Sequence, residues 1–283
     1  MPDISIVIVV HRESLDVLRA CFDAVKVAQG VSYEVFVVDN GANDEYRALV
    51  EPMPHATYIR NGKNMGFAYA VNRGMERSTG RYVLLLNPDT VVPGDAMAKM
   101  VQHLNEDKDV GIASCIIRYP DGTLQDSIRR FPTPIDQLIT LVKLPHVFNR
   151  LAPIDRYMMR DADPLKTQDV DSIMGAFMFI RRELLDRIGL LDERYFIWFE
   201  EVDYCKMAVD AGFKVRHYAD VEIIHHKGHT FNKQSTILKQ RWVRTSLRKY
   251  LRKHHGLVPW LMFWALTPVF VVLAYVAATI KRH

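Results

Sequence analysis

The sequence predicts an α/β fold with a mostly parallel central sheet and helices on both of its faces. Between residues 4 and 106, short apolar runs alternate with segments of helical periodicity, which is typical of strand–helix–strand units. The apolar runs lack regular polar positions, as expected for strands that are covered on both faces. Several of them end in polar residues, at the edge where open α/β sheets bind ligands.

The predicted elements follow one another in a regular order. Apolar, β-branched runs predict strands, and amphipathic runs predict helices. The predicted strands are 4–10, 34–38, 57–60, 82–86, 111–117 and 172–180, and the predicted helices are 14–28, 43–50, 67–77, 95–106 and 182–188. Residues 132–169 show weak periodicity with scattered prolines, so we expect a mobile excursion over the ligand site there.

Polar residues end three of the predicted strands. They are His11-Arg12, Asp39-Asn40 and Asn87-Pro88-Asp89. Adjacent parallel strands that end in this way would form one acidic rim. Asp39 could accept a hydrogen bond from the imide N–H of uracil or thymine, and Asp89 could bind a divalent cation that neutralises a diphosphate.

Other motifs narrow the kind of site. Asn64-Met65-Gly66 precedes a predicted helix, and a glycine at a helix start lets the backbone approach a ligand closely. The chain has neither Gly-x-Gly-x-x-Gly nor a Walker motif, which excludes the common dinucleotide and P-loop sites.

A second acidic group stands beside aromatic residues. Glu200, Glu201 and Asp203 follow Trp198 and Phe199. Acidic residues at a helix start commonly complement the helix dipole. Burial among aromatic rings, however, raises the pKa of a carboxyl group, which suits a general base.

Three histidines follow a later apolar strand. They are His225, His226 and His229. A cluster of this kind could be structural or could include a metal ligand.

In this order, the motifs resemble those of the inverting nucleotide-sugar glycosyltransferases of family 2, which have the GT-A fold. The resemblance covers residues 4–230 and rests on Val37-Val38-Asp39-Asn40, Asn64-Met65-Gly66-Phe67, Leu86-Asn87-Pro88-Asp89, Gly175-Ala176, Leu191-Asp192-Glu193, Glu200-Glu201-Val202-Asp203 and His225-x-x-Gly228-x-Thr230. Residues 121–132, which contain Asp121-Gly122-Thr123-Leu124-Gln125, are similar to the bacterial rhamnosyltransferase-like branch. That branch extends lipid-linked surface glycans from dTDP-sugars.

The resemblance implies a role for each matching residue. The donor-binding residues would be His11, Asp39, Asn64, Gly66, Asn87 and Asp89, the acceptor-binding residues Gly175, Trp198, Glu200 and Asp203, and the ligands of Mg²⁺ or Mn²⁺ Asp89 and His225. Glu201 falls at the position of the catalytic base, where the family normally has Asp. The choice of base among Glu200, Glu201 and Asp203 therefore stays open.

The charge of the chain is divided unevenly. No acidic residue follows Glu222, and eleven Lys and Arg residues lie beyond it. Because the whole chain carries +4, the part that ends at Glu222 carries −7. A basic tail on an acidic body predicts an anionic partner surface, either a membrane or a nucleic acid.

An apolar run at the end of the chain favours the membrane and not nucleic acid. Residues 257–280 form 24 positions without a charged side chain, enough to span a bilayer at about 1.5 Å per residue. Basic residues recur every three or four positions before it, as in a helix on anionic headgroups: Lys239, Arg241, Arg244, Arg248 and Arg252. A buried core helix is the alternative. Pro259 and Pro268 leave a kinked span or a re-entrant hairpin open.

We therefore expect three regions: a GT-A catalytic domain at 1–230, a basic amphipathic helix on the membrane surface at 231–256, and a hydrophobic membrane anchor at 257–280. Basic residues crowd the N-terminal flank of the anchor, so the positive-inside rule places the catalytic domain at the cytoplasmic face of the bacterial inner membrane. Three scattered cysteines form no disulfide framework, which agrees with a reducing compartment.

The expected function is the inverting transfer of a sugar, with L-rhamnose from dTDP-rhamnose as the first choice, onto a hydroxyl of a polyprenyl-diphosphate-linked glycan. A UDP-sugar donor and an inactive glycosyltransferase-like scaffold in a membrane assembly are the alternatives. A nucleotidylyltransferase is disfavoured, because no glycine-rich loop follows the first strand.

Overall fold

A nine-stranded sheet forms the centre of the computed structural model, which describes all residues except 147, 149, 227–235 and 281–283. The strand order is β3-β2-β1-β4-β10-β6-β11-β5, and β8 pairs with β11. The strands of this sheet are β1 (Ile4–Val10), β2 (Tyr33–Asp39), β3 (Ala56–Arg60), β4 (Tyr82–Leu86), β5 (Thr90–Val91), β6 (Val110–Arg118), β8 (Gln168–Asp169), β10 (Phe177–Arg181) and β11 (Lys214–His225). A separate pair joins β7 (Ile128–Arg129) to β9 (Ser172–Ile173).

The prediction of a mostly parallel sheet holds only in part, because the sheet is mixed: β10 is antiparallel within it, and β5 and β8 are antiparallel to β11. β1 runs parallel to β2 and β4, β2 to β3, and β6 to β11. β10 is antiparallel to both of its neighbours, β4 and β6. The single strand predicted at 172–180 is wrong. β9 pairs with β7, whereas β10 lies in the main sheet, so the two strands are separated by residues 174–176. This connection brings Gly175 beside the end of β4, where Asn87 N donates to Ala176 O.

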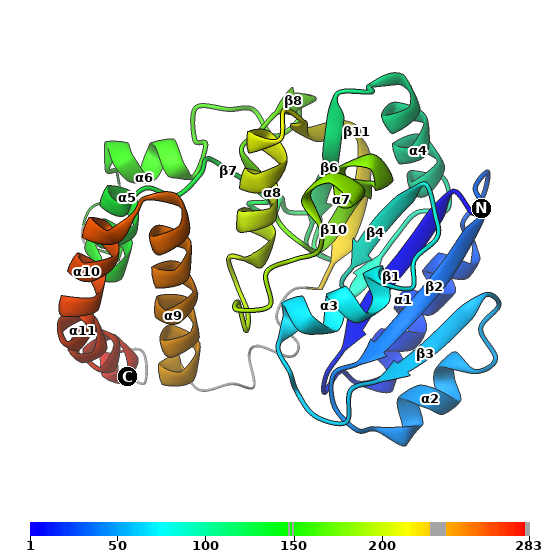
Figure 1. Ribbon diagram of the computed structural model, residues 1–283, viewed down its shortest axis with the longest axis horizontal. Coiled ribbons are helices and arrows are strands. Elements are labelled where there is room, and N and C mark those ends of the chain that lie inside the picture. The colour runs from blue at the N-terminus through cyan, green and yellow to red at the C-terminus, as the bar shows by residue number, and fades with distance from the viewer. Residues whose placement is uncertain (147, 149, 227–235, 281–283) are drawn as a thin grey trace.

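Helices cover both faces of the sheet (Figure 1). One face carries α1 (Leu15–Lys26), α2 (Asp44–Val50) and α4 (Ala96–Glu106), and the other carries α3 (Phe67–Met75), α7 (Arg182–Ile188) and α8 (Glu200–Asp210). In β1, Ile6 and Ile8 pack with the first group of helices and Val7 and Val9 with the second, so every residue of the strand is buried. This double burial explains why the strand reads as a continuous apolar run.

The excursion predicted at 132–169 contains regular structure. It holds α5 (Pro134–Leu141), a 3₁₀ turn η1 (Leu144–His146) and α6 (Ala152–Tyr157). A capping box begins α5, because the Thr133 hydroxyl accepts from the backbone of Asp136, and the Asp136 carboxylate accepts from Thr133 N. None of its described residues lines the cavity described below, so the expected cover over the site is wrong.

The C-terminal helices pack on the α/β domain through an apolar cluster. They are α9 (Thr236–His254), α10 (Leu257–Ala265) and α11 (Thr267–Ile280). The cluster consists of Leu141, Tyr195, Phe199, Leu247, Tyr250, Leu251, Phe263 and Phe270. In Figure 1 these helices lie beyond α8 from the sheet, together with α5 and α6. The helix expected at 231–256 is confirmed over 236–254, and 231–235 lie outside the described residues.

The apolar side of α9 therefore faces protein. Leu247 and Leu251 are fully buried in the cluster, and Arg244, expected on the basic surface, is 7% exposed. Burial and the neighbouring Arg248 lower the pKa of Arg244. The expected amphipathic helix thus has its apolar side on protein, and of the five basic residues expected on headgroups, Arg241 and Arg252 are exposed.

The long apolar run at 257–280 divides into α10 and α11. Among the described residues, no single helix is both long and apolar enough to cross a bilayer, and the two meet that requirement only as a pair bent by 47°. Pro268 explains the break, since it has no N–H for a helical hydrogen bond and its ring clashes with the preceding turn. A straight membrane-spanning helix is not supported.

Candidate active site

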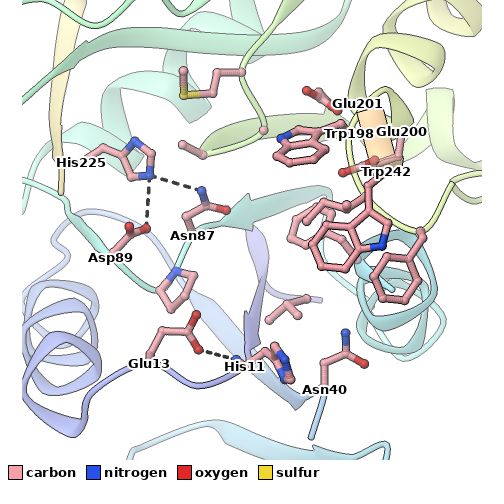
Figure 2. A pocket seen from close by; sticks show the side chains of 18 of the residues that line it. His11, Glu13, Asn40, Asn87, Asp89, Trp198, Glu200, Glu201, His225 and Trp242 are labelled. Atoms are coloured by element: carbon pink, nitrogen blue, oxygen red, sulfur yellow. Dashed lines mark hydrogen bonds and ion pairs between the residues drawn. The ribbon is translucent and has the colours of Figure 1, made fainter. Parts of the chain in front are cut away.

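A cavity of about 630 Å³ opens at the carboxyl ends of β1 and β4. Figure 2 shows its lining: His225, Asp89 and Asn87 lie on one side, and Glu200, Glu201, Trp198 and Trp242 lie on the other. His11, Glu13 and Asn40 complete the wall at the ends of β1 and β2. The strand tips and the second acidic group, which are more than 100 residues apart in sequence, thus share one cavity.

The loop after β4 holds Asp89 against the end of β11. His225 Nε2 lies 3.1 Å from Asp89 Oδ1 and 3.3 Å from Asn87 Nδ2. The loop is fixed by its backbone, because His226 N donates to Asp89 O (2.9 Å) and Asn87 N donates to Ala176 O (3.0 Å). Of the other predicted histidine-motif residues, Gly228, His229 and Thr230 lie outside the described part of the chain.

Asp89 and His225 offer donor atoms that suit Mg²⁺ or Mn²⁺. A carboxylate oxygen and an imidazole nitrogen, both lining the cavity, stand 3.1 Å apart, and Mn²⁺ accepts both types of ligand. No group of three or more His, Cys, Asp or Glu residues converges in the described residues. Two protein ligands would leave the remaining coordination positions to water and to ligand phosphates, which is the usual pattern for such ions.

The candidate base lies at the start of α8, after a strained turn. Trp198 (φ 64°) and Phe199 (φ 73°) are both left-handed, which costs about 1–3 kcal/mol for each such residue. This turn begins the helix at Glu200, so the Glu200-Glu201 pair faces the cavity. Gly175 lies against the base, because a Cβ built there would stand 3.6 Å from Glu201 Cβ.

Burial makes both glutamates weak acids. It raises the pKa of Glu201 to about 6. Burial is the main cause that raises the pKa of Glu200 well above its ordinary value, and the negative charge of Glu201 raises it further. One oxygen of each, Oε2, finds no hydrogen-bond partner among the described residues. A desolvated carboxylate with a free oxygen can accept a proton from a ligand hydroxyl near neutral pH.

Sequence reasoning did not place Trp242 in the site. This residue of α9 lines the cavity, with its ring centroid 5.3 Å from that of Phe196 and 6.4 Å from that of Trp198. Ser246, one turn later, donates to Ile197 O (2.8 Å) and so fixes the same segment. The only signal was the apolar stripe of the basic helix, which indicates packing but no particular partner.

Asp203 is a correction, because it lies outside the cavity. Its carboxylate is buried and binds Lys253 Nζ (2.7 Å) and His254 Nε2 (2.6 Å) of α9. Asp203 therefore joins α8 to α9 and does not contact an acceptor. The choice of base narrows to Glu200 and Glu201.

Replacing Asp203 with Ala is expected to lower the free energy of unfolding by about 3 kcal/mol, because it removes a buried carboxylate that pairs with the largely buried His254 and with Lys253 of α9. Urea unfolding of the purified protein measures the change. Asp210→Ala is the matched control, since Asp210 pairs with Lys206 on the surface of the same helix and exposed pairs contribute about 1 kcal/mol or less. Equal effects of the two substitutions would contradict the role of Asp203.

Asp39 lies in an adjoining hollow of about 280 Å³, which shares His11 with the main cavity. Its buried carboxylate accepts from Gly41 N (2.9 Å), Asn43 N (2.9 Å) and Tyr58 Oη (2.6 Å). A carboxylate offers about four acceptor positions, so about one is left for a ligand. Asp39 mainly shapes the loop after β2.

The glycine motif before α3 has a packing role. Asn64 lines the cavity, and its Nδ2 lies 3.1 Å from His11 Nε2. Gly66 does not line it, which corrects the expectation of direct donor contact. With φ at +99°, a Cβ at Gly66 would stand 2.8 Å from Phe196 O. Only glycine lets this turn approach the segment that carries the aromatic residues.

Comparison with known proteins agrees with this site. The sequence profile described as glycosyl transferase family 2 matches residues 5–189. The chain belongs to this family. The glycosyltransferase is similar to the N-acetylglucosaminyl-diphospho-decaprenol L-rhamnosyltransferase of Mycobacterium tuberculosis (strain H37Rv), at 26% identity over 69% of this chain and 67% of the relative. It is also similar to rhamnosyltransferase WbbL of Escherichia coli (strain K12), at 23% identity over 78% and 83% of the two chains.

The fold of this glycosyltransferase has a solved counterpart. The mannosyltransferase PcManGT from Pyrobaculum calidifontis, in complex with GDP-Man and Mn²⁺, has a TM-score of 0.60 at 19% identity, over 98% of this chain and 74% of that one. At this identity the likeness shows the fold alone. The GT-A architecture and the rhamnosyltransferase-like branch that the motifs predicted are confirmed. Glu200, Glu201, His225 and Trp242 lie beyond the residues that the family profile matches.

Proposed function

We propose that this glycosyltransferase moves L-rhamnose from dTDP-rhamnose onto a hydroxyl of a polyprenyl-diphosphate-linked glycan in bacterial surface polysaccharide synthesis, with inversion at the anomeric carbon. One observation carries the proposal: a desolvated carboxylate, Glu201, faces Asp89 and His225 across a single cavity. The proposed general base therefore lies opposite Asp89 and His225, the side where the leaving group would bind, as an in-line displacement requires.

The reaction is a single displacement. Glu201 accepts the proton of the acceptor hydroxyl while that oxygen forms a bond to the anomeric carbon. The bond from this carbon to the diphosphate oxygen breaks on the opposite face, and dTDP leaves with the bonding electrons. Mg²⁺ or Mn²⁺, held by Asp89 and His225, would supply charge that stabilises the departing diphosphate.

The acceptor side of the cavity is aromatic. Phe196, Trp198 and Trp242 lie beside Glu200 and Glu201 and line the same wall. Flat apolar rings suit the face of a pyranose, and the two carboxylates suit its hydroxyls. The name of the M. tuberculosis relative specifies a sugar on diphospho-decaprenol, which supports an acceptor of this class here.

Binding and transfer assays test the donor and the acceptor. We expect dTDP-rhamnose with Mn²⁺ to raise the melting temperature, and UDP-sugars to raise it less. We also expect rhamnose to be transferred to a synthetic polyprenyl-diphosphate-N-acetylglucosamine. Stabilisation and transfer with a UDP-sugar alone would replace the proposed donor. Donor binding without transfer or donor hydrolysis would favour an inactive scaffold.

We further propose that α10 and α11 lie in the cytoplasmic face of the bacterial inner membrane, parallel to its surface. Each helix buries one side, at Phe263 or Phe270, and exposes apolar residues on the other: Val258 (78%), Trp264 (60%) and Val272 (60%). Exposed apolar residues next to basic ones suit anionic lipid surfaces. This position would hold the cavity at the height where a lipid-linked sugar leaves the membrane.

Flotation with anionic liposomes measures this attachment. The combined substitution Val258→Ser, Trp264→Ser and Val272→Ser is expected to move most of the protein from the liposome fraction to the aqueous one, because it removes the apolar contact. Val27→Ser is the control, since Val27 is 57% exposed at the end of α1, in the catalytic domain. Unchanged flotation of the triple variant would contradict the proposal.

A further inference from the structure

We infer that Gln125 is a positioning residue that holds His225 in the tautomer with a bare Nε2, so that this nitrogen can bind a divalent cation beside Asp89. The inference rests on the metal site of the proposed function, and it assigns a role to a residue that neither the reaction nor the fold has used. Gln125 does not line the cavity. It acts through His225.

A tight turn delivers Gln125 to this position. Gly122 N donates to Tyr119 O (2.9 Å), and Tyr119 N donates to Thr123 O (2.8 Å). Gly122 has φ at +84°, a conformation that favours glycine. The chain then returns along β6, where Gln125 N donates to Ile117 O (2.8 Å). The Asp121-Gly122-Thr123-Leu124-Gln125 motif is thus a hairpin that brings an amide side chain to the end of β11.

The neighbours of the Gln125 amide decide which way it faces. Its Nε2 group donates to His225 O (2.6 Å) and to Arg118 O (3.3 Å). Both partners are backbone carbonyls, which can only accept. The amide oxygen Oε1 must therefore face the ring of His225, and it lies 2.9 Å from Nδ1.

This orientation fixes the proton of the imidazole. Oε1 can only accept, so Nδ1 must carry the hydrogen, and the neutral ring has its lone pair on Nε2. That lone pair faces the cavity, 3.1 Å from Asp89 Oδ1. Gln125 and His225 are each 4% exposed, so water is poorly placed to substitute for the amide. The opposite tautomer would set the lone pair of Nδ1 against Oε1.

A ring nitrogen that is held in this way is the usual form of a metal-binding histidine. Such histidines donate their second N–H to a fixed acceptor, and loss of that acceptor typically lowers metal affinity by about 10–100-fold. Asn87 Nδ2, 3.3 Å from Nε2, can donate to the same lone pair when no cation is bound. Asp89 Oδ1, 3.1 Å from Nε2, can only accept, so in this tautomer a cation placed between the two would bind both lone pairs.

The tautomer can be observed directly by ¹⁵N NMR of the histidine rings. In metal-free protein at a pH where His225 is neutral, we expect a protonated Nδ1 and an unprotonated Nε2. The His225→Asn variant identifies the signal by its disappearance from the eleven histidines of the chain. A protonated Nε2 in the wild-type protein would overturn the inference.

Mn²⁺ binding tests the consequence. Free Mn²⁺ is measured by electron paramagnetic resonance in titrations without and with dTDP. Gln125→Leu removes the acceptor and is expected to weaken Mn²⁺ binding about 10–100-fold. Gln125→Glu keeps an acceptor for Nδ1–H and is expected to bind Mn²⁺ within a few-fold of the wild type. Gln102→Leu is the control, because the Gln102 amide donates to Glu106 on the exposed surface of α4.

The outcomes separate this inference from the proposed function, since neither readout needs sugar transfer. Wild-type Mn²⁺ affinity in folded Gln125→Leu, or no Mn²⁺ binding by the wild-type protein in either titration, would overturn it. If Gln125→Leu does not fold, the inference is tested by the tautomer of His225 in the wild-type protein and by the Mn²⁺ affinity of Gln125→Glu. If the predicted tautomer and the predicted Mn²⁺ affinities are observed but no rhamnose is transferred, the proposed reaction is overturned and the role of Gln125 stays intact.

Discussion

Replacing Glu201 with Gln is expected to lower the rate of sugar transfer by about 10²–10⁴-fold and to leave donor affinity nearly unchanged. The amide keeps the size of the side chain but cannot accept the hydroxyl proton. Steady-state transfer rates give the first effect, and calorimetric titration with the nucleotide sugar gives the second. Glu200→Gln is the matched comparison, because it removes the neighbouring carboxylate of the same buried pair.

The pH dependence of transfer provides a second measurement on the same residue. A general base must be deprotonated, and burial raises the pKa of Glu201 to about 6. Transfer is therefore expected to be full above this pH and to fall as pH decreases through it. Because two carboxyl groups interact, the apparent value belongs to the pair. If Glu201→Gln transfers sugar at the normal rate while Glu200→Gln does not, the base is Glu200.

Replacing Asp89 with Asn is expected to lower transfer by about 10³-fold and to weaken Mn²⁺ binding strongly, because it removes the negative charge of the carboxylate that is proposed to bind the metal. The backbone contacts of the loop, such as His226 N to Asp89 O, remain available. The melting temperature should therefore change little. Loss of folding in this variant would show a structural role for the carboxylate.

The effect of Asn87→Ala is expected to be much smaller. Asn87 contributes a neutral amide, 3.3 Å from His225 Nε2, so its removal leaves both proposed metal ligands in place. Transfer rates and Mn²⁺ titrations of the two variants are compared side by side. Equal losses would mean that Asn87 supplies as much to the site as Asp89 does.

Local sequence was sufficient for the parts of this protein that depend on local burial. The strand β4 and the acidic loop after it follow from an apolar run and a proline, and Asp89 lies where that pattern predicts. The pairing of Asp89 with His225 came from the resemblance to the family, because the histidine cluster alone left a structural role open. Glu201 lines the cavity as expected, but its choice as the base came from the resemblance, because the sequence alone offered Glu200, Glu201 and Asp203 equally.

The errors concern residues whose partners are distant in sequence. Asp203 belongs to the same acidic and aromatic segment as Glu201, but it lies two positions further along α8 and faces Lys253 and His254 instead of the cavity. Gly66 has the composition of a ligand-binding turn, but the chain it approaches is Phe196. Tertiary contacts of this kind leave no periodic signal.

At the end of the chain, the structure shows the bend that Pro268 left open and does not support a straight span. Composition alone cannot distinguish a helix that crosses a membrane from two helices that bury one side each. Phe263 and Phe270 face the protein, whereas Trp264 is exposed. The relevant signal was Pro268, which interrupts the helix inside the apolar run.

The packing of α9 beside the cavity has a practical and an evolutionary consequence. A shortened protein that ends after residue 226 would keep every residue matched to the family, yet it would lack Trp242 from the cavity wall and the partners of Asp203. A truncation that removes α9 would thus take away one wall of the cavity. Exchange of C-terminal helices between relatives would likewise exchange a cavity wall and the exposed apolar side of α10 and α11 together.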